Sequence, residues 1–445
     1  MRLQSVSDIY ISMKNRLSKS THLIAVSLLV CASWIGTASA QDIQSSILSR
    51  YGYGVLAHPA PTALKGMGGV GVALSGPKFI NLTNPAAYAA SDSLSFLMDI
   101  AVSANWGRYS DGSEKKNTFL GNFDYIAFQF PLWKDRLVFS TGLTPFSTTG
   151  YGLSSKVNVK DVDDVYSIVQ DFSGSGSIQS LYAGMGFKVW RGLSLGANVR
   201  YLFGKTIHNV TNVPGSTLIS TTRDSHTLRL SNVLMDLGAQ YRMELSKDKA
   251  LRFGATFAPS MKLTPEIVLQ HEESYGSINL PQITQRELKE ATRSPLRAAL
   301  GVAYEGGAKL LVSGDVELVK WGSVPNIFEN DAVILKDAYR VAIGTQYRPD
   351  LYSRRYSDRI LYRGGVSFDT SYASTPGIGQ MNMLGVSLGL GLPINVNDER
   401  TSYVDLALEY RTSLPSASKV LREDCLKVSL SFNFNETWFR KLRIY

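Results

Sequence analysis

Cysteine and long apolar runs are almost absent from this sequence. Its 445 residues include two cysteines, and Cys31 lies among the first forty residues, so Cys425 alone cannot form a disulfide within the rest of the chain. No run of eighteen apolar residues follows Gln41, which excludes an ordinary helical membrane protein. The classes that remain are a soluble periplasmic protein, a secreted protein and an outer-membrane β-barrel.

Charge of one sign and candidate catalytic groups are also scarce. The net charge of +9 falls to about +6 without the first forty residues, which carry four basic residues and one acid, and no basic stripe indicates a nucleic-acid partner. Histidines beyond residue 40 are His58, His208, His226 and His271. None has a metal-ligand spacing, and His271-Glu272-Glu273-Ser274 is no catalytic triad. We therefore predict no enzyme, no cofactor and no metal, and we interpret Asp161-Val162-Asp163-Asp164 as a solvated acidic loop in preference to a calcium site.

The first forty residues have the pattern of a signal peptide. Lys14, Arg16 and Lys19 precede the apolar run from Leu23 to Val30, and Ala38-Ser39-Ala40 supplies small residues before a cleavage site. Met13 is an alternative start to Met1. The predicted mature chain begins at Gln41 and is exported.

Strict alternation of apolar and polar residues predicts an all-β protein. Between residues 426 and 435 one face is wholly apolar, from Leu426 to Phe434, and the other is polar, from Lys427 to Asn435. The same rhythm recurs often enough to predict about fourteen strands. They begin near Leu94, Phe123, Leu137, Ile178, Leu193, Leu228, Leu251, Leu296, Leu310, Tyr339, Leu361, Met383, Val404 and Leu426.

The polar faces favour a membrane barrel over a soluble sandwich. They carry charges of both signs interleaved with glycine, which suits a crowded, hydrated lumen, and tyrosines stand near strand ends as in an interfacial girdle. The lumenal charges are predicted at Arg200, Asp236, Arg242, Arg297, Asp315, Glu317, Arg340, Arg363, Asp405, Glu409 and Arg411. The interleaved glycines are Gly196, Gly238, Gly301, Gly344 and Gly365. A soluble protein with tyrosine-capped strands is the alternative.

Short and long connections alternate along the chain, as expected for short periplasmic turns and long outer loops. The long connections are predicted at Asn105–Gly121, Ser147–Ser177, Gly204–His226 and Pro259–Ser294. Several strands are expected to run past the membrane into these connections as a rigid collar, for example at Met261–Gln270 and Ile283–Glu290. One predicted periplasmic connection, Arg348 to Arg359, is long and charged. It is either a small contact site or a solvated turn.

Two motifs precede the first strand. The glycines of the first, Gly66, Gly68, Gly69 and Gly71, match a dinucleotide fingerprint, but no strand precedes them and Ser75-Gly76-Pro77 would break a following helix. We interpret them as letting a compact plug pack inside a lumen. The second motif, Asn84-Pro85-Ala86, suits either a fixed plug or an ordinary turn.

A third motif, Thr144-Pro145-Phe146, interrupts the third predicted strand. Proline removes a ladder donor, so a kink, a bulge or a strand end is expected there.

The glycine-rich stretch, Asn84-Pro85-Ala86 and about fourteen following strands together resemble the FadL family, outer-membrane transporters of long-chain fatty acids and other hydrophobic molecules. The resemblance implies a signal peptide at 1–40, an N-terminal hatch at 41–92 and an outer-membrane β-barrel at 93–445. It also implies passive transport, with a lateral opening at the third-strand kink, where Gly142, Pro145 and Phe146 lie. Candidate residues for ligand capture are Tyr151, Leu153, Leu218 and Ile219, with Phe146 and Ile327.

The implied partners are a fatty acid-like ligand, outer-membrane lipid and the barrel-assembly machinery of a Gram-negative bacterium, with the barrel a monomer. The C-terminus matches the usual assembly signal only partly, because Lys441 and Arg443 stand where apolar residues are expected. Two alternatives stay open. One is a platform or shuttle for secreted proteins, and the other is a general porin.

Overall fold

The computed structural model describes residues 46–110, 115–134, 136–160, 165–215, 220–275, 278–289, 291–326, 334–375, 379–396, 401–414 and 422–437. The chain divides into two compact units, residues 1–43 and 44–445. The first unit, which includes the predicted signal peptide, lies outside the described residues. So do the acidic residues from Asp161 to Asp164 and the last eight residues of the chain.

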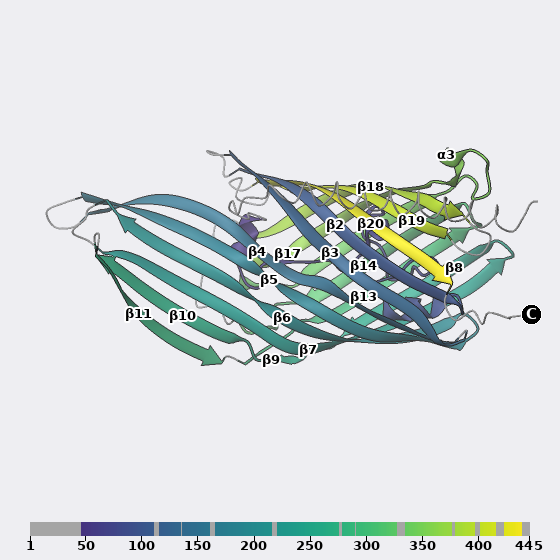
Figure 1. The fold of residues 1–445 in the computed structure, drawn as a ribbon, viewed down its shortest axis with the longest axis horizontal. Helices are drawn as coiled ribbons and strands as arrows, with labels where there is room; N and C mark the ends of the chain where they lie inside the picture. The colour runs from purple at the N-terminus through teal and green to yellow at the C-terminus, as the bar shows by residue number, and fades with distance from the viewer. Residues whose placement is uncertain are drawn as a thin grey trace, which may run out of the picture. The chain divides into compact units, whose positions relative to one another are not determined.

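Fourteen antiparallel strands form the wall of a closed barrel (Figure 1). They are β2 (Ser95–Ser110), β3 (Lys115–Trp133), β4 (Leu137–Lys160), β5 (Val165–Trp190), β6 (Leu193–Pro214), β7 (Thr221–Ser246), β8 (Lys249–Ala258), β13 (Leu296–Gly306), β14 (Leu310–Lys320), β16 (Ala338–Tyr347), β17 (Leu361–Thr375), β18 (Gly379–Val396), β19 (Thr401–Leu414) and β20 (Arg422–Thr437). The ring closes where β2 pairs with β20, from Ser95 opposite Thr437 to Ser110 opposite Arg422. The predicted number of strands and the predicted closure are confirmed.

Six shorter strands add to this wall. β1 (Val55–Leu56) pairs with β4, and β15 (Ile334–Leu335) pairs with β17. β10 (Glu266–Tyr275) and β11 (Ile278–Lys289) form a hairpin that joins the edge of β7. β9 (Lys262–Leu263) and β12 (Thr292–Arg293) form a separate two-stranded sheet.

Helical structure is limited to four short helices in the described part of the chain. They are η1 (Ile47–Arg50), α2 (Thr62–Lys65), η2 (Pro85–Ala90) and α3 (Tyr356–Arg359). Among the described residues, no helix has the length and apolar character needed to span a membrane.

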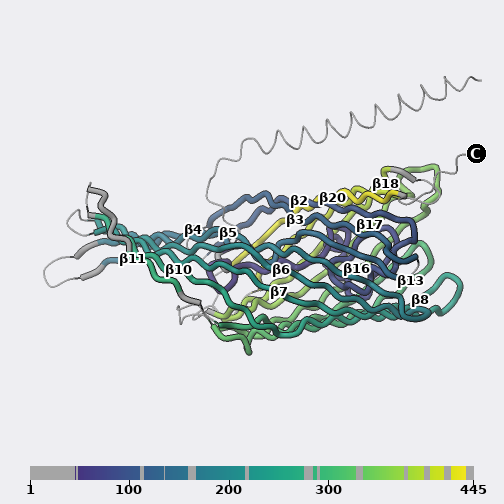
Figure 2. Tube along the Cα trace, turned by 60° about the horizontal axis from the view of Figure 1, so that its bottom comes forward, coloured from purple at the N-terminus to yellow at the C-terminus, as the bar shows by residue number. Residues whose placement is uncertain are grey.

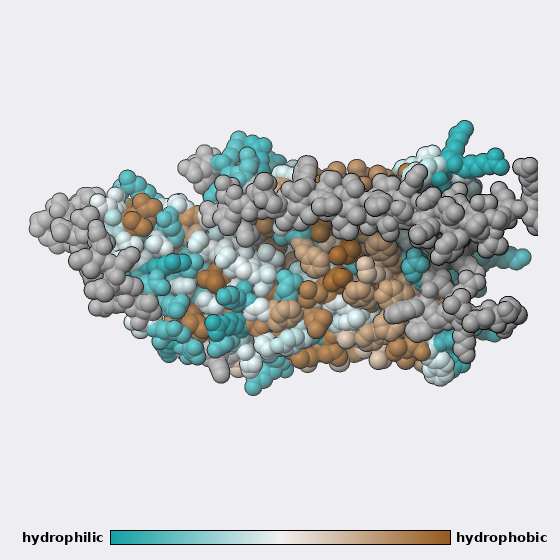
Figure 3. Space-filling view, in the orientation of Figure 1, coloured by the Kyte–Doolittle hydropathy of each residue, from teal (hydrophilic) through white to brown (hydrophobic). Residues whose placement is uncertain are grey.

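The two faces of each strand divide as the alternation predicts. Outward-facing side chains such as Val199, Leu300 and Ile343 are large, apolar and exposed. Figure 3 shows hydrophobic residues gathered over the strands on the face in view. The predicted lumenal charges point inward, where Arg363 pairs with Asp405. An apolar outer surface around an ionised interior is the arrangement of a barrel with lipid outside and water or polar groups inside.

The prediction of long outer loops is wrong in detail. Residues assigned to the loop Ser147–Ser177 continue β4 and β5 as a regular hairpin, and those assigned to Gly204–His226 mostly continue β6 and β7. These extensions and the β10–β11 hairpin run well beyond the ends of β13 and β14 in Figures 1 and 2. Beyond the part of the barrel with an apolar outer surface, both faces of a strand meet polar surroundings. The hydrogen-bond ladder continues there, but the alternation of apolar and polar residues that predicts a strand is lost.

At the opposite end of the barrel the connections are short, as predicted. The chain turns between β5 and β6 at Arg191-Gly192, and between β13 and β14 within residues 307–309. The charged connection between β16 and β17 is longer and contains α3. Its turn is folded on itself, because the Asp350 amide donates to the Asp358 carbonyl at 2.8 Å.

Placing a charge on the outer surface should test which face meets hydrocarbon. Leu300, in the middle of β13, is 68% exposed, and we expect Leu300→Arg to lower the free energy of unfolding in lipid vesicles by about 2–4 kcal/mol. Val169→Arg is the matched control, because Val169 is an exposed apolar residue on the extension of β5. This variant should lose little of its free energy of unfolding. Urea titrations read by the gel mobility of the folded barrel make the comparison, and equal losses for the two variants would contradict the assigned lipid face.

Candidate functional site: a packed lumen and a side cavity

Residues 57–91 lie inside the barrel and touch the inward faces of most of its strands (Figure 2). Met67, Val70, Ala73 and Ile80 in this segment are fully buried. We call residues 57–91 the N-terminal segment.

The backbone of the N-terminal segment packs directly on glycines of the wall. We call this set the glycine belt: Gly186, Gly196, Gly238, Gly254, Gly301, Gly344, Gly365 and Gly389. Several of its members are cross-strand partners, such as Gly196 with Gly238 and Gly344 with Gly365. A Cβ added at any belt position would come within 3 Å of the segment. All five interleaved glycines named from the sequence belong to the belt.

The glycine-rich stretch of the segment occupies the tightest part of this packing. Gly68 and Gly69 have φ values of +73° and +77°, which side chains rarely adopt. Gly66 lies against Gly389, where an added Cβ would be 2.8 Å from the Cα of the wall glycine. These glycines therefore follow α2 in a turn pressed against the wall, which is a different setting from a nucleotide-binding loop.

The side chain of Asn84 links three parts of the lumen. Its Oδ1 accepts from the Ala86 amide at 3.0 Å and caps η2, while Nδ2 donates to the Val72 carbonyl at 2.7 Å. The Nδ2 group also lies 3.3 Å from the carbonyl of Ala239 on β7. Pro85 takes the first position of η2, where its missing N–H costs nothing.

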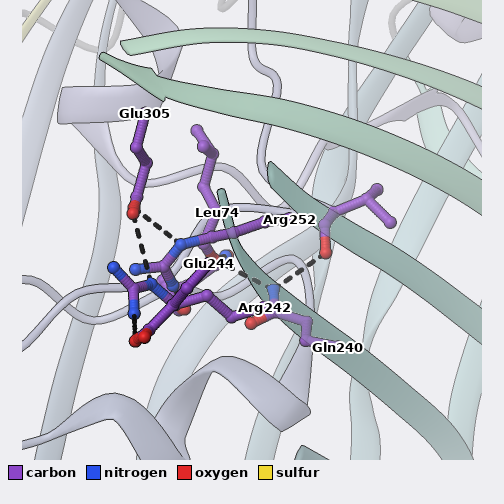
Figure 4. Close-up of polar contacts among 9 residues, drawn as sticks. Leu74, Gln240, Arg242, Glu244, Arg252 and Glu305 are labelled. Carbon is purple, nitrogen blue, oxygen red and sulfur yellow. Dashed lines mark hydrogen bonds and ion pairs between the residues drawn. The ribbon is translucent and has the colours of Figure 1, made fainter. Parts of the chain in front are cut away.

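Side chains of the wall bind the remaining backbone groups of the segment. Asp315 on β14 accepts from the amides of Gly71 and Val72 at 2.6 and 2.9 Å. Gln240 on β7 donates to the carbonyls of Val72 and Leu74 at 2.9 and 3.1 Å. Figure 4 shows the Gln240 contact with Leu74.

Four lumenal carboxylates each pair with two cations. Asp236 pairs with Arg200 at 3.1 Å and Arg297 at 3.2 Å, and Asp124 pairs with Lys65 at 2.5 Å and Lys427 at 3.3 Å. Asp369 lies between Arg340 and Arg411. In Figure 4, Glu305 lies between Arg252 and Arg242 in the same way. Lys65 belongs to α2, so one of these pairs fastens the N-terminal segment to β3.

A cavity of about 320 Å³ lies beside the N-terminal segment. Its apolar lining includes Leu56, Phe146, Leu234, Val319 and Tyr372, and its charged lining includes Arg200, Asp236, Arg297, Arg340 and Asp369. The cavity therefore has an apolar part and a charged part, and this lining suits an amphiphilic or hydrophobic small molecule.

Aromatic side chains pack beside this cavity, where the N-terminal part of the chain meets the connection after β14. The Trp321 ring lies 5.7 Å from the Tyr53 ring and 4.7 Å from the Tyr372 ring. The Tyr372 hydroxyl donates to the Gly54 carbonyl at 2.6 Å. Burial raises the pKa of Tyr53 to about 12, so its hydroxyl is neutral at ordinary pH.

The wall changes its pairing at the third-strand motif. β3 and β4 pair only as far as Ile126 opposite Leu143, and a register shift follows between Pro145 and Ser147 on the other edge of β4. Past this point β4 pairs with β1, at Ser147 and Thr148. We call the unpaired stretch between β3 and β4 the seam. Pro145 and Phe146 border both the seam and the cavity, whereas Gly142 lies in the paired part.

Two other predicted capture residues, Tyr151 and Leu153, do not line the cavity. Tyr151 is buried further along β4, where its hydroxyl lies 3.0 Å from His208 Nδ1, and Leu153 pairs with Phe172. Leu218, Ile219 and Ile327 lie outside the described residues. Analysis of the sequence missed Leu234 and Val319, although each is an apolar residue at an inward position of a strand whose other inward positions are mostly polar.

The four histidines are spread among different surroundings. His58 Nε2 lies 3.0 Å from the Gly69 carbonyl, and His271 contacts Asp224 at 2.6 Å and Glu273 at 3.2 Å on the outer hairpin. Hydrogen bonding to Asp224 raises the pKa of His271. Among the described residues, no group of three or more His, Cys, Asp or Glu side chains is placed to hold a metal.

Comparison with known proteins assigns the family. A model described as BamG matches residues 21–445. The chain belongs to the BamG family. No curated protein sequence matches this BamG-family chain.

Solved structures of similar fold are outer-membrane transporters and channels. A FadL homologue of Pseudomonas aeruginosa has a TM-score of 0.56 at 14% identity, over 85% of this chain and 99% of that one. The toluene transporter TodX of P. putida has a TM-score of 0.55 at 15% identity, over 86% and 100%. The toluene transporter TbuX of Ralstonia pickettii has a TM-score of 0.53 at 16% identity, over 86% and 99%. The predicted resemblance to the FadL family is confirmed for the fold of this BamG-family barrel.

A methyl group on the glycine belt should disturb the N-terminal segment. An added Cβ at Gly365 would overlap Met67, whereas at the adjacent Gly364 the nearest atom is 3.9 Å away. We expect Gly365→Ala to cost about 1–3 kcal/mol through overpacking and to expose the buried Lys65 to trypsin. Gly364→Ala should behave as wild type. Identical cleavage of both variants would contradict the packing described here.

Proposed function

We propose that this BamG-family barrel is a passive outer-membrane transporter of hydrophobic molecules such as long-chain fatty acids, with no enzymatic activity. The observation that carries the proposal is the position of the cavity. It lies beside the N-terminal segment, has an apolar part, and is bordered by Pro145 and Phe146 at the seam. A hydrophobic ligand gains about 0.8 kcal/mol for each methylene group it buries there.

In this proposal the N-terminal segment is a hatch. It fills the lumen, so the ligand does not follow a straight aqueous path but leaves sideways through the seam into the membrane. The segment is held by the glycine belt and by Asp315 and Lys65, which disfavours a general porin. Gly66, Gly68, Gly69 and Gly71 shape the hatch, and Asn84, Pro85 and Ala86 fix its far end.

The proposed partners follow from the same path. They are a fatty acid-like ligand, the lipids around the seam and the barrel-assembly machinery that inserts the chain. Because the fourteen strands close on themselves, we infer that a monomer is sufficient.

A platform for secreted proteins is the second candidate. It is favoured by the extensions of β4 to β7 and the β10–β11 hairpin, which place a broad polar sheet beyond the apolar zone. Deleting residues 266–289 would remove that hairpin. If uptake persisted while a cargo protein lost its attachment, the platform would replace the transporter as the proposed function.

Filling the cavity should block transport. Ala258 lines the cavity at the end of β8, and we expect Ala258→Trp to lower the uptake of a labelled long-chain fatty acid by about tenfold or more, because the indole fills much of the apolar part. Ala298→Trp is the matched control, since Ala298 stands on the neighbouring strand β13 next to the inward-facing Arg297 and so on the opposite face of the wall. Uptake by Ala258→Trp at the wild-type rate, with the barrel folded, would contradict this path.

A further inference from the structure

Asp99 on β2 differs from most of the buried lumenal aspartates; Asp315 also lacks a paired cation in the described part of the chain, but it accepts from the amides of Gly71 and Val72. Asp124, Asp236, Asp369 and Asp405 each pair with lysine or arginine. Asp99 is only 2% exposed, and no ion pair joins it to a cation among the described residues. Its Oδ1 has no hydrogen-bond partner. A buried carboxylate without a compensating charge is costly.

Neutral oxygen donors surround this carboxylate. Asn433 stands directly opposite Asp99 across the β2–β20 pair, and Ser431, opposite Ala101, takes the next inward position along β20. Both polar atoms of the Asn433 amide and the Oγ of Ser431 are buried and have no hydrogen-bond partner.

Two further buried groups complete the surroundings. Gln129 on β3 stands opposite Leu97, one inward position along from Asp99, and a long side chain can reach across such a diagonal. Neither polar atom of its amide has a partner. From the hatch side, the Thr62 amide donates to the Tyr125 hydroxyl at 3.0 Å, and the buried Thr62 hydroxyl is unpartnered.

We infer that Asp99, Asn433, Ser431 and Gln129 form a binding site for one hard metal cation at the boundary between wall and hatch. Carboxylate, amide and hydroxyl oxygens are the ligands that such cations prefer. A cation would coordinate the unpartnered oxygens and balance the charge of Asp99 together, whereas water could bond the oxygens and the amide nitrogens but would leave the charge unbalanced. Sodium balances the single carboxylate, and calcium suits the same donors.

The site has a structural consequence. Tyr125 stands opposite Ala101, the next inward residue after Asp99 on β2, and accepts from the Thr62 amide, so a bound cation would order the wall at the point where α2 rests on it. This role is independent of what the cavity transports, because none of the four ligands lines the cavity.

Thermal unfolding of the full-length barrel in detergent tests the inference. After treatment with chelator and dialysis into choline chloride, the protein is melted in choline chloride, sodium chloride or calcium chloride at one ionic strength, with the folded fraction read by gel mobility. A cation that binds only the folded barrel should raise the apparent Tm with saturating dose, by about 3 °C or more well above its Kd. Choline is too large for the site and should have no effect.

Variants assign the effect to Asp99. Asp99→Asn and Asn433→Leu should each abolish the salt-specific rise, and Asn433→Leu keeps the result interpretable if Asp99→Asn does not fold. Asp248→Asn makes the same change of charge on an exposed periplasmic turn and should retain the rise. A wild-type Tm equal in all three salts overturns the inference in favour of water or a proton at Asp99, as does a rise that survives in both lumenal variants.

Discussion

Contact between two backbones, without side chains between them, is the constraint on which this structure depends. The N-terminal segment passes so close to the wall that an added Cβ would overlap it at every position of the glycine belt. At Gly344 and Gly365 the wall accommodates Met67, and at Gly254 and Gly301 it accommodates Val72 and Ala73. Each of these pairs is also a cross-strand pair. The N-terminal segment therefore packs on pairs of glycines that lie side by side on neighbouring strands.

This packing explains why so many charges can lie inside the barrel. Close approach of the hatch removes water from the lumen, which raises the cost of any unpaired charge. Several of these charges are compensated because one carboxylate pairs with two cations, as Asp236 does with Arg200 and Arg297. Where the hatch leaves room, the same wall bounds a cavity with apolar and ionised parts. The proposed path uses a place where β3 and β4 are not paired, beside Pro145.

The barrel could be predicted from the sequence because lipid and lumen impose opposite demands on alternate residues. Because of that contrast, strands such as residues 426–435 are easily predicted. The charges and glycines predicted on the lumenal faces also lie there in the structure. The extended strands expected at Met261–Gln270 and Ile283–Glu290 overlap β10 and β11. The regular course of β4 to β7 beyond the membrane was not predicted, because polar surroundings on both faces remove the contrast. The wall residues that bind the N-terminal segment could not be predicted from the sequence either. Nothing near Gly68 indicates that its carbonyl accepts from Arg340 on β16. The cavity depends on which inward positions meet across the lumen, and that is a property of the closed ring.

Thiol accessibility tests the central claim most directly. With Cys425 replaced by serine, a cysteine at Met67 would lie under Gly344 and Gly365, where Met67 has no exposed surface. The structure predicts that this cysteine resists a small, water-soluble maleimide from both sides of the membrane while the barrel is folded, and reacts after denaturation. Rapid labelling of the folded barrel would show that the hatch does not pack against the glycine belt.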